Sequence, residues 1–253
     1  MTPLLRTHDL SVRFGGEVAV DCVSASFFPG TLTAIVGPNG AGKTTFFNLI
    51  SGQIRASAGE VWLKGRPITR LSVPARARRG LGRAFQLTNL FPALSVFENV
   101  RLAVQAEARR DFRLFSLASD HRDLMRKSDA LIERVGLSAR AQLAASALSH
   151  GDQRKLEVAL LLALQPDVFM FDEPTAGMSV DEVPSVLDLI ATIKHDRTKT
   201  ILLVEHKTDV IRALADRVIV LHQGRMLADG APAEVMALAI VQDAYLGHAG
   251  TSG

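Results

Sequence analysis

The sequence has few of the features that mark a secreted or membrane-spanning protein. It contains one cysteine, Cys22, in 253 residues, so no internal disulfide can form and we expect a reducing compartment. The N-terminal stretch has no apolar core of signal-peptide length. The most apolar stretch, residues 156–171, is interrupted by Glu157 and by residues 165–167, so no run approaches the roughly 20 apolar residues that cross a bilayer. We therefore expect another chain to supply any membrane crossing.

The sequence also has little excess of positive over negative charge. The formal net charge is +3, which is too small to indicate a nucleic-acid partner, and we predict none. The arginines do form two local groups. A solvated face explains most of them, and contact with a partner or with lipid headgroups is the alternative. The groups are Arg76, Arg78, Arg79 and Arg83, then Arg109, Arg110 and Arg113.

The pattern of apolar residues predicts strands that alternate with helices. Such alternation is typical of a mainly parallel sheet covered on both faces. The middle, from about 95 to 165, has helical spacing; Leu131, Ile132, Val135 and Leu137 fit one apolar face. We expect strands over 4–14, 17–28, 31–36, 61–63, 168–171, 200–204, 217–221 and 226–228, and a helix over 181–195.

A glycine-rich loop follows the 31–36 strand and precedes a helix. Residues 37–45 read Gly-Pro-Asn-Gly-Ala-Gly-Lys-Thr-Thr and fit the spacing G-x-x-x-x-G-K-[ST]. Glycines let successive backbone N–H groups point at phosphate oxygens, and the helix N-terminus favours an anion. The lysine supplies charge to the β- and γ-phosphates, and the first threonine supplies a hydroxyl for Mg²⁺. The sequence thus predicts that ATP binds at Gly37, Asn39, Gly40, Ala41, Gly42, Lys43, Thr44 and Thr45.

Two carboxylates follow the apolar strand at 168–171. Asp172 and Glu173 would lie at the edge of the sheet where open α/β folds bind ligands. Asp172 would hold Mg²⁺, and Glu173 would act as general base or would position the attacking water. A surface pair after a core strand would explain these residues equally well if the phosphate loop were absent.

Two polar residues at strand ends complete the predicted catalytic set. His206 follows the strand that ends at 204, where its imidazole could reach the γ-phosphate. Gln86 ends the short segment 82–86, where a neutral amide could bind Mg²⁺ or the water. We therefore predict Glu173, His206 and Gln86 as catalytic residues, and Thr44, Gln86 and Asp172 as ligands of Mg²⁺.

These elements, in this order, resemble the ABC ATPase family over roughly residues 4–247. The decisive addition is Leu-Ser-His-Gly-Asp-Gln-Arg at 148–154, which is similar to the signature motif usually written LSGGQ. Ser149 is a good N-cap, and its hydroxyl, the Gly151 N–H and the helix dipole make a second anion site. The resemblance implies a head-to-tail dimer in which the phosphate loop of one subunit and the signature helix of the other enclose ATP, so that hydrolysis opens and closes the dimer.

The resemblance also implies the fold and further roles. A single ABC ATPase domain, 1–253, would contain a P-loop NTPase core at about 1–86 and 166–253, with a mainly parallel sheet and helices on both faces. An antiparallel β subdomain and a helical subdomain at about 87–165 would complete it. By similarity, Phe14 stacks on adenine, Gln86 belongs to the loop that couples to membrane subunits, and His206 is the switch histidine.

Three positions depart from the family pattern. His150 replaces a glycine and Asp152 replaces a glutamine of the signature. Ser179 stands where many members have an aspartate. These departures concern communication between subunits and not ATP binding.

Several details resemble the branch that takes up branched-chain, hydrophobic amino acids: the signature sequence, the helical insert at 105–130 and the ending Ala-Tyr-Leu-Gly. This resemblance implies two integral-membrane permease subunits and a dimer with a second copy or with a second ABC ATPase subunit. It also implies a periplasmic or extracellular substrate-binding protein as an indirect partner, and a peripheral position on the cytoplasmic side of the plasma (inner) membrane. Alternatives are an importer of urea or amides and an ATPase for lipopolysaccharide export. The single ABC unit disfavours a nucleic-acid or ribosome ATPase, and the complete catalytic set disfavours a non-catalytic module.

Overall fold

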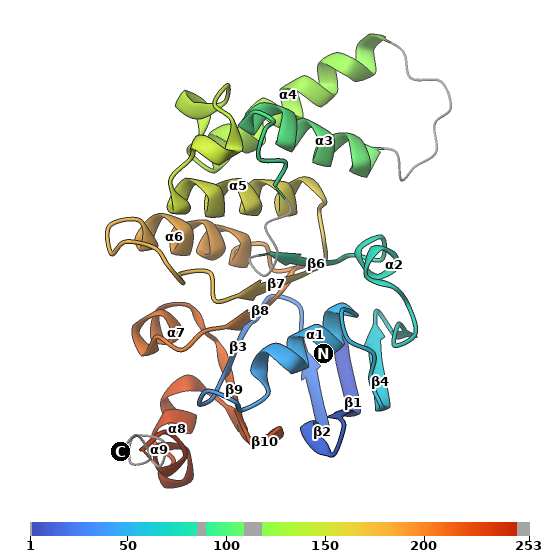
Figure 1. Ribbon diagram of the computed structural model, residues 1–253, viewed down its shortest axis with the longest axis vertical. Helices are drawn as coiled ribbons and strands as arrows, with labels where there is room; N and C mark the ends of the chain where they lie inside the picture. Colours follow the sequence, from blue (N-terminus) through green and yellow to red (C-terminus); the bar gives the residue numbers. More distant parts are fainter. Residues whose placement is uncertain (1, 85–89, 109–117, 247–253) are drawn as a thin grey trace. The chain divides into compact units, whose positions relative to one another are not determined.

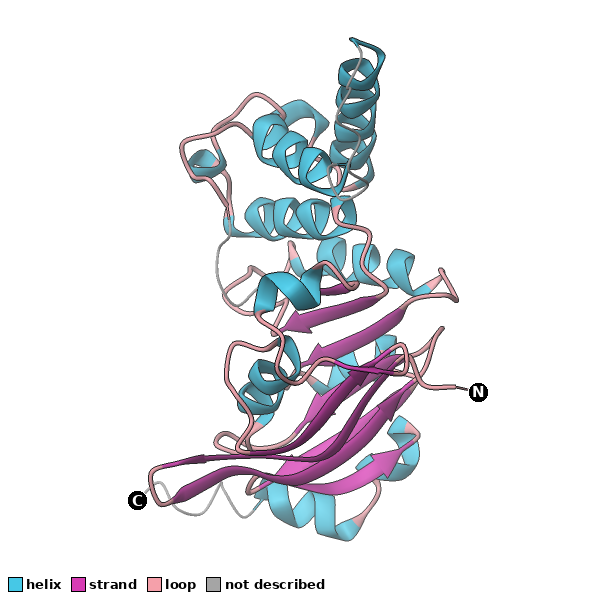
Figure 2. Ribbon diagram, turned by 90° about the vertical axis from the view of Figure 1, so that its right-hand side faces the viewer, coloured by secondary structure: helices cyan, strands magenta, loops and turns pink. Residues whose placement is uncertain are grey.

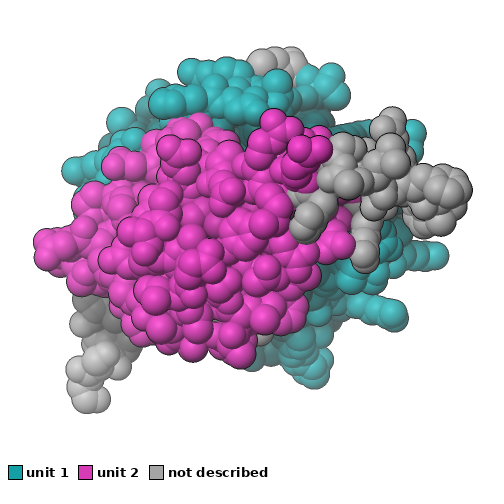
Figure 3. Space-filling view, turned by 90° about the horizontal axis from the view of Figure 1, so that it is seen from above, with its two compact units in different colours: residues 1–81, 167–173, 193–253 teal, residues 82–166, 174–192 magenta. Residues whose placement is uncertain are grey.

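The computed structural model describes residues 2–84, 90–108 and 118–246. The chain forms two compact units, coloured separately in Figure 3. Unit 1 contains residues 1–81, 167–173 and 193–253, and unit 2 contains residues 82–166 and 174–192. The domain organisation expected from the sequence stays a prediction.

An antiparallel sheet begins unit 1, as the family resemblance implies. Its strand order is β2-β1-β4-β5. The β1–β2 hairpin pairs Leu5 with Phe27 and Phe14 with Glu17, and Gly15 turns the chain with a φ of 59°, which suits glycine. The strands are β1 (Leu5–Phe14), β2 (Glu17–Phe27), β4 (Ala58–Leu63) and β5 (Arg66–Pro67).

The second sheet has the order β10-β9-β3-β8-β7-β6. β3 runs parallel to β8 and β9, and β7 runs parallel to β8, whereas β10 is antiparallel to β9. Every residue of β3, β7 and β8 is buried, as expected of strands covered on both faces. This arrangement confirms the predicted fold class. The strands are β3 (Leu32–Val36), β6 (Leu81–Ala84), β7 (Val168–Asp172), β8 (Thr200–Val204), β9 (Arg217–His222) and β10 (Arg225–Gly230).

The two faces of this sheet pack into different cores. Because side chains alternate along a strand, Ile35 and Ile219 join a core with the antiparallel sheet and α1, whereas Ala34 and Val218 join a core with the C-terminal helices. Figure 1 shows α1 on one side of β3 and the helices α8 and α9 on the other, and Figure 2 shows the strands as neighbouring magenta arrows. The helices of unit 1 are α1 (Lys43–Ser51), α2 (Val73–Ala77), α7 (Thr208–Leu214), α8 (Pro232–Met236) and α9 (Ala239–Leu246).

Unit 2 is helical, as the sequence predicts for its middle region. Ile132, Val135 and Leu137 are buried, and Leu131 is partly exposed. The helix expected over 181–195 begins at Val183 instead, because Pro184 is favoured in a first helical turn and not further inside. The helices are α3 (Val96–Ala108), α4 (Ala118–Arg134), α5 (His150–Ala163) and α6 (Val183–Lys194), with short 3₁₀ turns at Ser138–Arg140 and Ala145–Ala147. Within the described ranges, no helix is both long and apolar enough to span a bilayer.

One arginine departs from the solvated face expected for its group. Arg76 of α2 is 2% exposed, and its Nη1 donates to the carbonyl oxygens of Leu49 at 2.7 Å and Ile50 at 2.5 Å. The last carbonyls of a helix have no partner within the helix, so Arg76 caps the C-terminal end of α1. Burial lowers the pKa of the Arg76 guanidinium to about 10.

Candidate functional site

The loop between β3 and α1 is held tightly by glycines. Gly37 has a φ of 147°, and a Cβ there would lie 2.1 Å from the Leu221 carbonyl oxygen. Gly42 has a φ of 94°, and a Cβ there would lie 2.5 Å from the Ala19 carbonyl oxygen. Both positions therefore require glycine, because neighbouring backbone leaves no room for a side chain.

The N-terminus of α1 is open to an anion. Gly42 is the N-cap, and within the described chain no side chain caps α1 and no acidic residue lies in its first turn. The first N–H groups of a helix lack partners and carry partial positive charge. Thr44, Asn39 and Gly40 are exposed beside this helix end, so the loop fits a phosphate group.

Lys43 brings a buried positive charge to this loop. Its side chain belongs to a residue only 8% exposed, and Nζ donates to the carbonyl oxygens of Gly37 at 2.7 Å and Pro38 at 2.9 Å. Burial lowers the pKa of the Lys43 ammonium, and the carboxylates of Glu173 and Asp172 act in the opposite direction. The fold thus gathers the three charges that the sequence analysis placed in one site.

The two carboxylates at the end of β7, Asp172 and Glu173, lie in different environments. Asp172 is 7% exposed, whereas Glu173 is partly exposed. Glu173 has a φ of 49°, although its backbone N–H still donates to the Val204 carbonyl oxygen at 2.9 Å. A non-glycine residue in the left-handed region is strained, and such strain gathers at functional sites.

His206 lies at the end of the neighbouring strand β8. Its side chain is 54% exposed, and Nδ1 lies 3.5 Å from Oε1 of Glu205. Glu205 is fully buried and accepts hydrogen bonds from the backbone N–H groups of His206 at 2.9 Å and Lys207 at 3.2 Å. Glu205 fixes this loop and was not among the predicted site residues. Its signal in the sequence was its position directly after a buried strand, which is the position that Glu173 has after β7.

Two further predicted residues were Phe14 and Gln86. Phe14 ends β1 and is 51% exposed, so its ring is accessible to a planar ligand. Gln86 lies outside the described residues.

Ser149 and Gly151 begin α5 in unit 2. Ser149 is the N-cap, as expected, and its Oγ accepts a hydrogen bond from the Asp152 N–H at 3.2 Å. Asp152 is 5% exposed, and its carboxylate pairs with Arg140 at 2.9 Å and Lys155 at 3.3 Å. Asp152, which replaces the glutamine of the signature, therefore forms two ion pairs, and its negative charge in the first turn stabilises the start of the helix.

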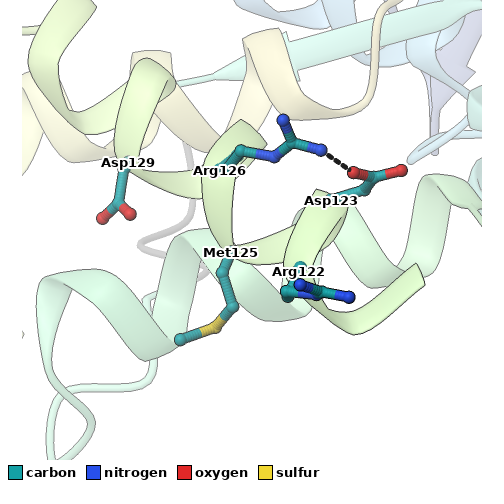
Figure 4. Close-up of a pocket in the computed structure, with 5 residues that line it drawn as sticks. All are labelled: Arg122, Asp123, Met125, Arg126 and Asp129. Atoms are coloured by element: carbon teal, nitrogen blue, oxygen red, sulfur yellow. Dashed lines mark hydrogen bonds and ion pairs between the residues drawn. The ribbon is translucent and has the colours of Figure 1, made fainter. Parts of the chain in front are cut away.

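The helix α4 carries a pocket on its surface. Figure 4 shows Asp123 and Arg126 joined by an ion pair at its edge. All its lining residues come from one helix, so it is a charged helix face and we assign it no function. The lining residues are Arg122, Asp123, Met125, Arg126 and Asp129.

A phosphate-type loop between a parallel strand and a helix, with carboxylates at the end of another parallel strand of the same sheet, is the arrangement of a P-loop nucleoside triphosphatase. Within that class, the family described as ABC transporter matches residues 20–176, and the chain belongs to this family.

Similar proteins extend over nearly the whole chain. The chain is 35% identical to the high-affinity branched-chain amino acid transport ATP-binding protein LivG of Escherichia coli (strain K12), over 98% of this chain and 99% of that protein. It is 34% identical to BraF of Pseudomonas aeruginosa, a protein of the same description, with the same coverage. The crystal structure of the ADP conformation of MJ1267, an ATP-binding cassette of an ABC transporter, matches with a TM-score of 0.83 and 26% identity, over 98% of this chain and 100% of that one.

Family membership defines the general activity. The chain is an ATP-binding cassette, an ATPase whose hydrolysis is coupled to transport. Membership also implies an ATPase dimer and partner subunits embedded in the membrane.

Proposed function

We propose that this chain drives the uptake of branched-chain or other hydrophobic amino acids through two separate permease subunits. The observation that carries this proposal is the 34–38% identity, over 98% of the chain, to branched-chain amino acid transport ATP-binding proteins. This similarity favours amino acids over urea, amides or lipopolysaccharide. The subunit would lie peripherally on the cytoplasmic side of the plasma (inner) membrane, and a substrate-binding protein on the other side would deliver the amino acid.

The first part of the site would bind ATP. The open N-terminus of α1 and the buried ammonium of Lys43 support phosphate binding by the loop. The exposed ring of Phe14 supports stacking on adenine. The phosphate-binding residues would be Gly37, Asn39, Gly40, Ala41, Gly42, Lys43, Thr44 and Thr45.

The second part would bind Mg²⁺ and activate water. The Thr44 hydroxyl and the buried Asp172 carboxylate suit Mg²⁺, which prefers oxygen ligands and is usually held by one or two carboxylates plus phosphates; Gln86 would be a further ligand. When bound, the ion neutralises phosphate charge. Glu173 would accept a proton from the attacking water, and His206, on the loop fixed by Glu205, would contact the γ-phosphate.

A head-to-tail dimer would complete the site. Ser149 and Gly151 form a second anion site in unit 2, and one nucleotide needs only one phosphate loop. The partner would be a second copy of the chain or a second ABC ATPase subunit. In this dimer, Ser149 and Gly151 of one subunit would bind the γ-phosphate held by Lys43 of the other.

The test is recovery of partners from native membranes. Tagged Glu173→Gln protein is captured in the presence of ATP, and bound proteins are identified by mass spectrometry, with Lys43→Ala protein as the nucleotide-site control. We expect two polytopic permeases, together with a second ABC subunit or untagged copies of this chain. Uptake of labelled leucine and of urea then identifies the cargo. Recovery of ribosomal or DNA-repair proteins with no membrane partner would overturn the proposal.

A further inference from the structure

A carboxylate of this chain lies at the N-terminus of α5. Ser149 Oγ donates a hydrogen bond to Oε1 of Glu182 at 2.8 Å, and the Gly151 backbone N–H donates another to the same carboxylate. The contact is close, because a Cβ on Gly151 would lie 2.6 Å from Glu182 Oε1. The residues all belong to unit 2. An internal anion therefore uses the two donors that the proposed function assigns to a γ-phosphate.

The second oxygen of this carboxylate is also bound. Ser179 donates to Oε2 of Glu182 from its backbone N–H at 3.4 Å and from its Oγ at 3.2 Å. Glu182 lies in the turn before α6. The hydrogen bond from Ser149, followed by those from Ser179 and Gly151, holds the pKa of Glu182 below its usual range. Glu182 is therefore ionised at neutral pH and connects the loop after Glu173 to the start of α5.

The departure at Ser179 suits this contact. An aspartate at position 179 would place a second carboxylate beside that of Glu182. Like charges at this distance repel, whereas the serine hydroxyl donates a hydrogen bond. Ser179 and Glu182 thus form a matched pair in this chain.

We propose that Glu182 is an internal competitor that occupies the signature site until the γ-phosphate of a nucleotide held by the partner subunit displaces it. This inference rests on the proposed function. Carboxylate and phosphate need the same Ser149 hydroxyl and Gly151 N–H, and their negative charges repel, so only one occupies the site at a time. Displacement removes favourable hydrogen bonds of Glu182, which raises the ATP concentration at which the dimer closes. The competitor thereby keeps the ATPase open at low ATP.

The test measures the ATP concentration that half-saturates dimer formation. It compares Glu173→Gln protein with the same protein carrying a second substitution at Glu182. Sedimentation is measured on the full chain, alone and mixed with any second ABC subunit recovered from membranes. We expect Glu182→Gln to lower this concentration by about threefold to tenfold, since it removes the charge that competes for the helix end. Glu182→Ala, which removes all the contacts, is expected to lower it at least as much.

Asp181→Asn is the matched control, because it removes the same charge from the neighbouring exposed residue and is expected to leave the midpoint unchanged. Thermal melts verify that each variant folds. If dimers form with the same midpoint with and without the Glu182 carboxylate, or if Asp181→Asn shifts the midpoint equally, the inference is wrong and the proposed function stands. If no variant dimerises with ATP under any condition, the ATP-bridged dimer is wrong and the inference falls with it.

Discussion

The N-termini of α1 and α5 have the same backbone property and opposite surroundings. Gly42 is the N-cap of α1, and no side chain of the described residues caps this helix. Ser149 is the N-cap of α5, and its side chain caps the helix and also binds the Glu182 carboxylate. The partial positive charge of a helix end is therefore free for an outside anion in unit 1 and already used in unit 2. A helix N-terminus alone does not define what binds; the side chains around it do.

The first turns of the two helices also carry opposite charges: α1 has a lysine there and α5 has an aspartate. Lys43 begins α1, although a cation is unfavourable at a helix N-terminus. Asp152 lies in the first turn of α5, where an anion is favourable, and it is paired with Arg140 and Lys155. The start of α1 is thus suboptimal for stability and suited to a bound anion, as is typical of functional sites.

The largest expected effect comes from removing the cation at the open helix end. Lys43→Ala is expected to abolish measurable ATP hydrolysis, because the phosphate charge is no longer compensated. Steady-state phosphate release measures this, and Lys127→Ala, which changes an exposed lysine on α4, is the control. Unchanged turnover in the Lys43 variant would show that Lys43 does not bind the phosphates. The contrast between an open helix end at α1 and an occupied one at α5 would then be wrong.

The next effect separates binding of the anion from its chemistry. Glu173→Gln is expected to bind ATP normally and to slow hydrolysis by about 10²–10⁴-fold, the usual contribution of a general base. Equilibrium binding of a fluorescent ATP analogue and single-turnover hydrolysis measure the two quantities. Glu234→Gln in α8 is the control. A variant that hydrolyses ATP at the normal rate shows that another group acts as the base.

The smallest effect compares Gly37, which begins the phosphate loop before α1, with Gly151 in the first turn of α5. Gly37→Ala is expected to lower the free energy of unfolding by about 1–3 kcal/mol, because its left-handed φ and the rigid Leu221 carbonyl cannot accommodate a methyl group. Gly151→Ala is expected to change it by less than about 1 kcal/mol, because the three atoms nearest to the Cβ belong to the Glu182 side chain and not to backbone. Urea unfolding measures both. Equal destabilisation would show that the Glu182 carboxylate is not displaceable.

Local patterns were sufficient to predict the position of the phosphate loop and all the described strands except the short strands β5 and β6. The apolar run at 168–171 predicts β7 because a strand buried on both faces needs no polar residue. The glycines of the loop predict the tight turn that the structure shows. The predicted start of α6 at residue 181 was wrong by two residues, because the helix begins at Val183. The preference of Pro184 for a first helical turn is a local signal that would have corrected this prediction.

Contacts between distant residues could not be predicted. The left-handed backbone of Glu173 arises where its N–H bonds to Val204 on another strand, and no neighbour in sequence indicates it. Glu182 belongs to no motif, and its bond to Ser149 spans 33 positions. Arg76 resembles its exposed neighbours in sequence, and only the packing of α2 shows that it is buried.

The burial of Arg76 has a consequence for genetic screens. α1 has nine residues, which is too short to be stable as an isolated helix, so its geometry depends on its packing in the core and on the Arg76 guanidinium at its C-terminal end. A strain that loses growth on the transported nutrient through a change at Arg76 would look like a nucleotide-site mutant in every uptake assay, and its defect would be temperature-sensitive. A second-site suppressor that stabilises α1 would restore growth without touching any residue that contacts ATP.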